Sequence, residues 1–79
     1  MKEFIVLFHT HSGAIKFHRA IESKGIEGEL MPVPRKLSSS CGIGCKFQHD
    51  INIEEFISEE VERIFEIKEK DYIKVYEEE

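Results

Sequence analysis

The chain has 79 residues, of which 41% are hydrophobic and 34% charged, and its formal net charge is −5. This size predicts a single domain over residues 1–79 with a small core. The acidic balance argues against nucleic-acid binding, since the few clustered cations have no interleaved aromatic residues for base stacking. The longest apolar run, residues 4–8, is far shorter than the ~20 residues of a membrane span, and no signal peptide is recognised. We therefore expect no membrane partner and a cytoplasmic location, where thiols stay reduced.

The first half of the chain predicts a strand, a helix and an edge strand. Phe4 to His9 is a continuous run of strand-forming apolar residues, which indicates a central strand buried on both faces. The helix follows from apolar spacing, with Thr10 or Ser12 as its expected N-cap and Gly25 placed to end it. Its buried stripe comprises Ala14, Phe17, His18 and Ile21. The segment 29–33 should be an edge strand, because its prolines cannot donate hydrogen bonds to a sheet.

The second half predicts a strand, a long helix and a closing strand. Alternation from residue 43 places Ile43, Cys45 and Phe47 on one face of a strand. A helix is predicted from about Ile53 to Lys68, with a buried stripe that comprises Ile53, Phe56, Ile57, Val61, Ile64 and Phe65. Residues 72–76 are predicted to form the last strand. Its two tyrosines are expected on the sheet face away from the helices, so a homodimer through that face is an open alternative.

This order of elements predicts an α+β, ferredoxin-like βαββαβ fold, a four-stranded antiparallel sheet with two helices on one face. In that fold the first and second strands run toward the same end of the sheet. That end would gather residues 9–13, the amino terminus of the first helix and the segment 35–42. Cys41 would then lie close to His9 and His11.

Cys41 is the candidate reactive thiol. A cysteine reacts as its thiolate, which nearby cations and a helix amino terminus favour. Arg35, Lys36, Lys46 and His11 are the candidate cations, and the amides near residues 12 and 13 supply the helix terminus. The anion-binding groups that we expect around the thiol are Arg35, Ser39, Ser40, Gly42, Lys46, His9 and His11. The alternative is an exposed loop cysteine without a role.

Cys45 is better explained as a small core residue, since strand alternation places it beside Ile43 and Phe47. A transient disulfide with Cys41 stays open, because a tight turn through the glycines could bring the two α-carbons within ~7 Å. A metal site is disfavoured, since a lone C-x3-C lacks the second pair of ligands that zinc sites bring. No cofactor is indicated.

Several segments together resemble a known family. The opening FIVLFHTHSGA and the segment MPVPRKLSSSCGIG are similar to proteins of the selenium/sulfur (Se/S) carrier protein-like family, formerly a small domain of unknown function, and the resemblance covers about residues 4–76. Its most specific part is Pro34-Arg35, the serines 38–40, and Cys41-Gly42. The family's presumed carrier cysteine maps onto Cys41.

The resemblance implies a carrier rather than an independent enzyme. Cys41 would accept sulfur or selenium from a donor such as a cysteine desulfurase or a selenocysteine lyase. It would pass the atom to an acceptor such as selenophosphate synthetase or a thiol protein. Two alternatives remain: a thiol redox or metal-binding module that uses Cys41 and Cys45 together, and a non-catalytic regulatory or interaction domain.

Overall fold

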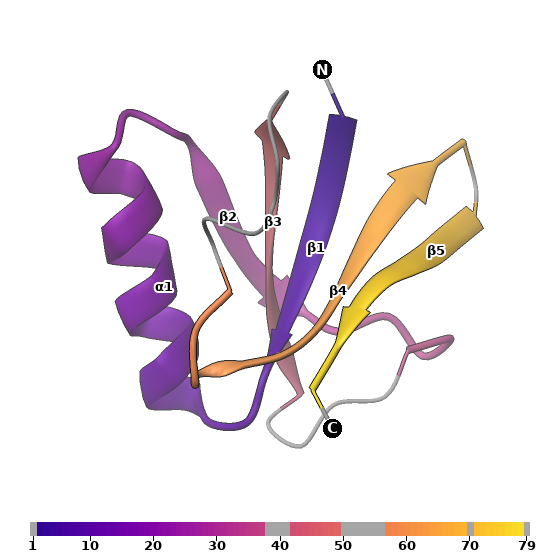
Figure 1. Cartoon of the computed structure of the whole chain (residues 1–79), viewed down its shortest axis with the longest axis horizontal. Helices are drawn as coiled ribbons and strands as arrows, with labels where there is room; N and C mark the ends of the chain where they lie inside the picture. The colour runs from indigo at the N-terminus through magenta and orange to yellow at the C-terminus, as the bar shows by residue number, and fades with distance from the viewer. Residues whose placement is uncertain (1, 38–41, 50–56, 70, 79) are drawn as a thin grey trace.

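The computed structural model describes residues 2–37, 42–49, 57–69 and 71–78. Along the chain it forms β1 (Lys2–Phe8), α1 (His11–Ser23), β2 (Gly28–Pro32), β3 (Ile43–His49), β4 (Val61–Lys68) and β5 (Asp71–Glu77). The five strands make one antiparallel sheet in the order β2-β3-β1-β4-β5, with α1 beside it (Figure 1). No helix within these described ranges is long and apolar enough to cross a membrane.

The α+β class and the antiparallel sheet are confirmed, but the ferredoxin-like arrangement is wrong. The predicted helix over 53–68 is strand β4 from Val61 onward, and residues 53–56 lie outside the described residues. The described part of the chain therefore has one helix and five strands, where two helices and four strands were expected. The predicted strands near 4–9, 29–33, 43–47 and 72–76 are all present, with β1 central and β2 at an edge.

A β-bulge explains why β4 resembles a helix in the sequence. Phe8 pairs with Val61 and Leu7 with Arg63, so one extra residue, Glu62, enters β4 at this point. The bulge brings Val61 and Ile64, three positions apart, onto the same buried face. Three-residue spacing of buried apolar residues is typical of helices, and a strand without a bulge would space them by two.

A second irregularity corrects the expected placement of the tyrosines. The register shifts between the Ile64–Tyr76 and Phe65–Lys74 pairs, so one extra residue enters β5. Tyr76 consequently packs against the helix-side core, whereas Tyr72 lies opposite Ile67. The two tyrosines do not share the face away from the helix, and the homodimer suggested from them remains untested.

The main core lies between α1 and the sheet. The helix contacts β1, β2 and β3, and aromatic rings fill the space beneath it, with centroids 5.2 Å apart for Phe8 and Phe17 and 5.9 Å apart for Phe17 and Phe47. Such tilted pairs are favourable beyond the area that they bury. The buried members of this core are Phe4, Val6, Phe8, Ala14, Phe17, Ile21, Cys45, Phe47, Val61 and Ile64.

Both ends of α1 are fixed by local hydrogen bonds. Of the two predicted N-cap candidates, Thr10 is the one observed, and its Oγ1 accepts a hydrogen bond from the Gly13 amide at 3.0 Å. At the other end Gly25 has a φ of +82°, and the Ile26 amide donates to the Ile21 carbonyl at 3.0 Å, which together form a Schellman motif. The predicted start and stop signals of this helix are confirmed.

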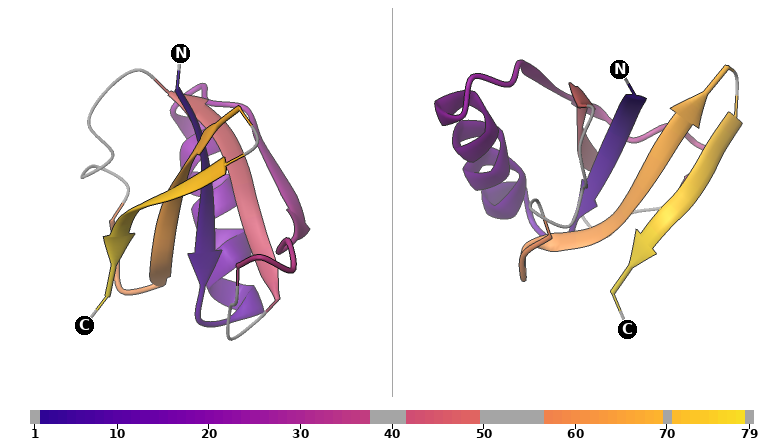
Figure 2. Two further views of the ribbon diagram at one scale, coloured as in Figure 1. Left: turned by 90° about the vertical axis from the view of Figure 1, so that its right-hand side faces the viewer. Right: turned by 45° about the horizontal axis from the view of Figure 1, so that its top comes forward.

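The sheet also buries side chains on the face that α1 does not cover. Ile5 and Leu7 point to that face, yet they are only 1% and 0% exposed. In the left view of Figure 2, α1 lies behind the sheet and the segment after β2 crosses in front of it. Three half-buried apolar residues of that segment, Val33, Pro34 and Leu37, are available to cover this face. The molecule thus has a second, smaller core.

Candidate functional site

The candidate site lies at one end of the sheet. β1 and β2 both end there, and β3 and β4 both begin there, because each is antiparallel to its neighbour in the sheet. This end therefore gathers the turn into α1 and the two ends of the connection between β2 and β3 (Figure 1). The predicted shared direction of β1 and β2 is confirmed, whereas residues 38–41 of the expected cluster lie outside the described residues.

The connection between β2 and β3 is closed at its base by a backbone hydrogen bond. The Val33 amide donates to the Gly42 carbonyl at 2.9 Å, and Gly42 is exposed with a φ of +74°. That φ favours glycine over any residue with a side chain. Gly42 directly follows Cys41 in the chain, whereas Ser39, Ser40 and Cys41 themselves lie outside the described residues.

A turn before the serines presents two cations. The Leu37 amide donates to the Pro34 carbonyl at 2.9 Å, which closes a turn with Arg35 and Lys36 at its centre. Both side chains belong to exposed residues. The structure therefore presents these two predicted cations to solvent, five and six residues before Cys41.

His9 is brought to the base of the same connection. The pairing of β1 with β3 ends at Leu7 opposite Gly44, and two residues further along the two chains lie His9 and Gly42. His9 Nε2 is enclosed and lies 3.3 Å from Glu78 Oε2, without a hydrogen bond of ordinary geometry among the described residues. This contact joins the end of β1 to the carboxyl-terminal end of β5.

His11 does not share a strand face with His9, although the two are only two residues apart in the chain. It is the first residue of α1 and is exposed, whereas His9 follows β1 directly and is half-buried. The chain turns at Thr10 between them, so the alternation rule for strands does not apply. The two imidazoles therefore occupy different environments.

The amino terminus of α1 already has an anion of its own, which the sequence did not predict. The backbone amide of Gly13 is used by Thr10, and the Glu60 carboxylate packs over Gly13 so closely that a Cβ there would lie 2.6 Å from its Oε2. Lys16 Nζ is 3.8 Å from the other oxygen of that carboxylate. The Gly13 amide is therefore not available to hold a thiolate. Glu60 directly precedes β4. It falls within the helix predicted from the sequence, so its contact with Gly13 was not expected.

Lys46 lies away from the base of the connection. Its Nζ is 3.5 Å from Glu3 Oε2. The residue lies in the middle of β3, where it pairs with Ile5 of the neighbouring strand β1. Four residues of extended chain separate it from Gly42, which is roughly 13 Å. The structure therefore does not bring Lys46 together with Gly42 and His9.

Cys45 is a core residue, as strand alternation predicted. It is 0% exposed, and it lies in β3 between Val6 of β1 and Leu30 of β2. Burial, with a smaller contribution from the charge of Glu22, raises the pKa of its thiol to about 12. A thiol with this pKa is protonated at neutral pH and is a poor nucleophile.

The histidine of the helix stripe is also explained by packing. His18, which was predicted in the buried stripe, is a half-buried residue at the edge of the core, and its Nε2 lies 2.8 Å from the Gly28 carbonyl oxygen. No cluster of three His, Cys, Asp or Glu side chains that could hold a metal ion occurs within the described ranges. A hollow of about 620 Å³ lies at the far end of the sheet, between the start of β2 and the end of β3.

Comparisons with known proteins agree with the resemblance seen in the sequence. The family model described as "Putative Se/S carrier protein-like" matches residues 3–77. Among curated proteins, the uncharacterized protein YtiA of Escherichia coli (strain K12) is 37% identical over 43 residues, which are 54% of this chain and 51% of that protein. The chain thus spans about half the length of this curated relative. No solved structure matches.

Proposed function

Since this chain belongs to the Se/S carrier protein-like family, whose model matches residues 3–77, we propose that it carries a sulfur or selenium atom on Cys41. The atom is held as a persulfide, Cys41-S-SH, or as the corresponding selenopersulfide. A donor protein supplies it and an acceptor removes it, so the chain works as a carrier between two other reactions.

The burial of Cys45 is the observation that carries this proposal. The sequence contains two cysteines, and one of them is completely enclosed with its pKa raised to about 12. Thiol chemistry at the surface therefore falls to Cys41. Its neighbour Gly42 is exposed and belongs to the end of the sheet where β1, α1 and the connection after β2 meet.

Loading of the carrier is a thiol exchange. The Cys41 thiolate attacks the outer sulfur of a donor persulfide, R-S-SH, and the bond between the two donor sulfurs breaks. The products are Cys41-S-SH and the donor thiolate, R-S⁻, so one sulfur atom moves without net oxidation or reduction. A thiolate with a pKa near the ambient pH serves best, because it must both attack and leave. A cysteine desulfurase or a selenocysteine lyase is a donor with suitable chemistry.

The exposed cations near the site suit anionic cargo. Arg35 and Lys36 project from the turn that precedes the serines, and His9 lies at the base of the connection. A hydropersulfide or hydroselenide is an anion once deprotonated, and cations nearby stabilise its charge. An acceptor such as selenophosphate synthetase, or a thiol protein, would collect the atom from this end of the sheet.

The test is the mass of the intact protein after exposure to inorganic polysulfide and, separately, to selenite with glutathione. We expect the wild type to gain one sulfur or selenium atom, the Cys41→Ala variant to gain none, and the Cys45→Ala variant to behave as the wild type. Loss of the adduct in both variants would favour a redox or metal module that uses two thiols. An unmodified wild type would contradict the carrier and favour an interaction domain, in which Cys41→Ser has no effect.

A further inference from the structure

We infer, on the basis of the proposed function, that cargo on Cys41 is discharged only to a nucleophile on a second molecule, and that Cys45 is not a resolving thiol. The reaction that consumes the loaded protein is then an intermolecular thiol exchange. The alternative is a resolving step inside the chain, in which the second thiol displaces the cargo and a disulfide forms. The surroundings of Cys45 decide between these two routes.

The Cys45 side chain is enclosed between the sheet and α1. It points to the helix side, where an added Cβ on Gly28 would lie 3.0 Å from its Sγ and 2.5 Å from Ile21 Cδ1. Ile21 of α1 is itself 1% exposed, so the helix is the cover over this part of the sheet. An attacking sulfur would therefore have to displace α1 to reach this thiol.

The backbone around Cys45 is held on both sides. β3 is an interior strand, and Cys45 lies opposite Val6 of β1 and Leu30 of β2. The base of the loop is also fixed, by the bond from the Val33 amide to the Gly42 carbonyl. Turning the Cys45 side chain toward the loop would require β3 to separate from two neighbouring strands.

Distance along the strand adds to this restraint. Gly42 and Cys45 are three residues apart in extended chain, which places their α-carbons roughly 10 Å from each other. Disulfide-bonded cysteines have α-carbons no more than ~7 Å apart. β3 thus keeps Cys45 away from Gly42, the described residue next to Cys41, as long as the strand is formed.

The two routes differ in their products. In the internal route, Cys41-S-SH and the Cys45 thiol would give a Cys41–Cys45 disulfide and hydrogen sulfide. In the external route, an acceptor thiolate A-S⁻ attacks the outer sulfur, A-S-SH forms and the Cys41 thiolate is regenerated. The external route leaves the carrier reduced and ready for another cycle, and its rate depends on the concentration of the acceptor.

The first experiment follows discharge by intact mass. The wild type is loaded with inorganic polysulfide, desalted, diluted and held with increasing concentrations of glutathione. We expect the added sulfur to persist without glutathione and to be lost at a rate proportional to its concentration. The Cys45→Ala variant should behave identically. Loss of sulfur without glutathione, with a product two hydrogens lighter than the reduced protein, would overturn the inference.

The second experiment does not depend on loading. The Cys41→Ala variant keeps Cys45 as its single thiol, and its reaction with an aromatic disulfide reagent is compared in native buffer and in denaturant. A thiol that reacts only after local opening should be at least about a hundredfold slower in the native protein. Similar rates would overturn the inference whether or not the wild type takes up sulfur. A wild type that fails to load would instead count against the proposed function.

Discussion

Gly28 lies where β2 packs tightly against α1. An alanine Cβ there would lie 2.5 Å from Ile21 Cδ1 and 3.0 Å from Cys45 Sγ. We expect Gly28→Ala to destabilise the protein by about 1–3 kcal/mol, as overpacking of a core does. Glu29→Ala, at an exposed position of the same strand, is the control and should change stability by less than about 0.5 kcal/mol. Urea unfolding measures both.

A double-mutant cycle tests the cause of that effect. Ile21→Val removes Cδ1, the atom that would clash with the new methyl group. The cost of Gly28→Ala should therefore be smaller in the Ile21→Val background than in the wild type. Equal costs in the two backgrounds would show that the destabilisation arises elsewhere.

Single residues could be placed from the sequence where a local rule governed them. Thr10 as the helix cap and Cys45 as a core residue follow from capping chemistry and from strand alternation, and both are confirmed. Glu60 could not be placed, because its contact with Gly13 depends on where β4 begins. Lys46 was expected near the loop because it is close in sequence, but an extended strand carries it away.

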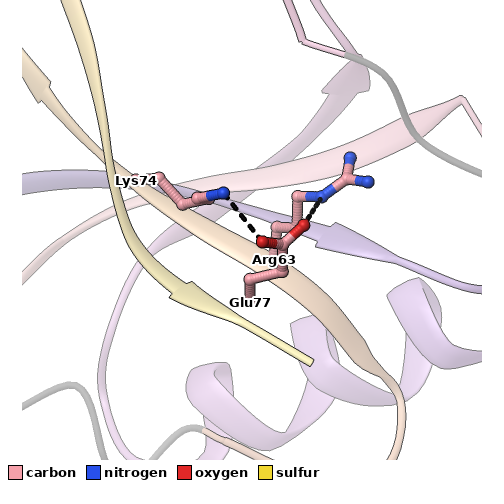
Figure 3. Close-up of polar contacts among 3 residues, drawn as sticks. All are labelled: Arg63, Lys74 and Glu77. Atoms are coloured by element: carbon pink, nitrogen blue, oxygen red, sulfur yellow. Dashed lines mark hydrogen bonds and ion pairs between the residues drawn. The ribbon is translucent and has the colours of Figure 1, made fainter. Parts of the chain in front are cut away.

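At the scale of elements, the hairpin of β4 and β5 carries a charge network. Glu77 accepts from Lys74 Nζ at 2.7 Å and from Arg63 Nε at 3.2 Å (Figure 3). The hydrogen bond from Lys74, followed by that from Arg63, lowers the pKa of the Glu77 carboxyl below its usual 4.5. All three side chains are accessible to solvent, so the effect on stability should be small and sensitive to salt.

The lowered pKa predicts how this hairpin responds to acid. The stabilisation from a lowered carboxyl pKa is complete above the unfolded value and is lost as the pH falls through the folded value. The melting temperature of the wild type should therefore exceed that of Glu77→Gln at neutral pH, and the difference should begin to shrink as the pH falls below about 4.5 and vanish once the carboxyl is protonated in the folded protein. Glu59→Gln, at an exposed position, is the control. A difference that stays constant with pH would argue against the network.

The same hairpin shows why its secondary structure was misassigned. Val61 and Ile64 share a face because of the extra residue opposite the Leu7–Phe8 step, and Ile64 is followed by a second shift against β5. Buried apolar residues three positions apart are typical of a helix, but here a β-bulge causes that spacing. The regular alternation of β3 and the continuous apolar run of β1 contain no such irregularity, and both were predicted correctly.

At the scale of the whole molecule, β1 is buried on both faces because different segments of the chain cover the two sides of the sheet. The apolar run of residues 4–8 predicted a strand buried on both sides, and all five residues are buried. One face is covered by α1. The other face was expected to be covered by no helix, and no sequence pattern predicted that the segment after β2 crosses it (Figure 2). That crossing depends on tertiary contacts between segments far apart in the chain.

The second core makes a quantitative prediction about Leu7. Although Leu7 faces away from α1, it is completely buried, so Leu7→Ala should destabilise the protein by about 2–5 kcal/mol. A domain of this size has roughly 4–12 kcal/mol of stability in total, so the variant should be marginally folded. Ile73→Ala removes an apolar side chain that is 44% exposed, and it should cost less than about 1 kcal/mol. Similar urea midpoints for the two variants would contradict a buried second core on the face of the sheet away from α1.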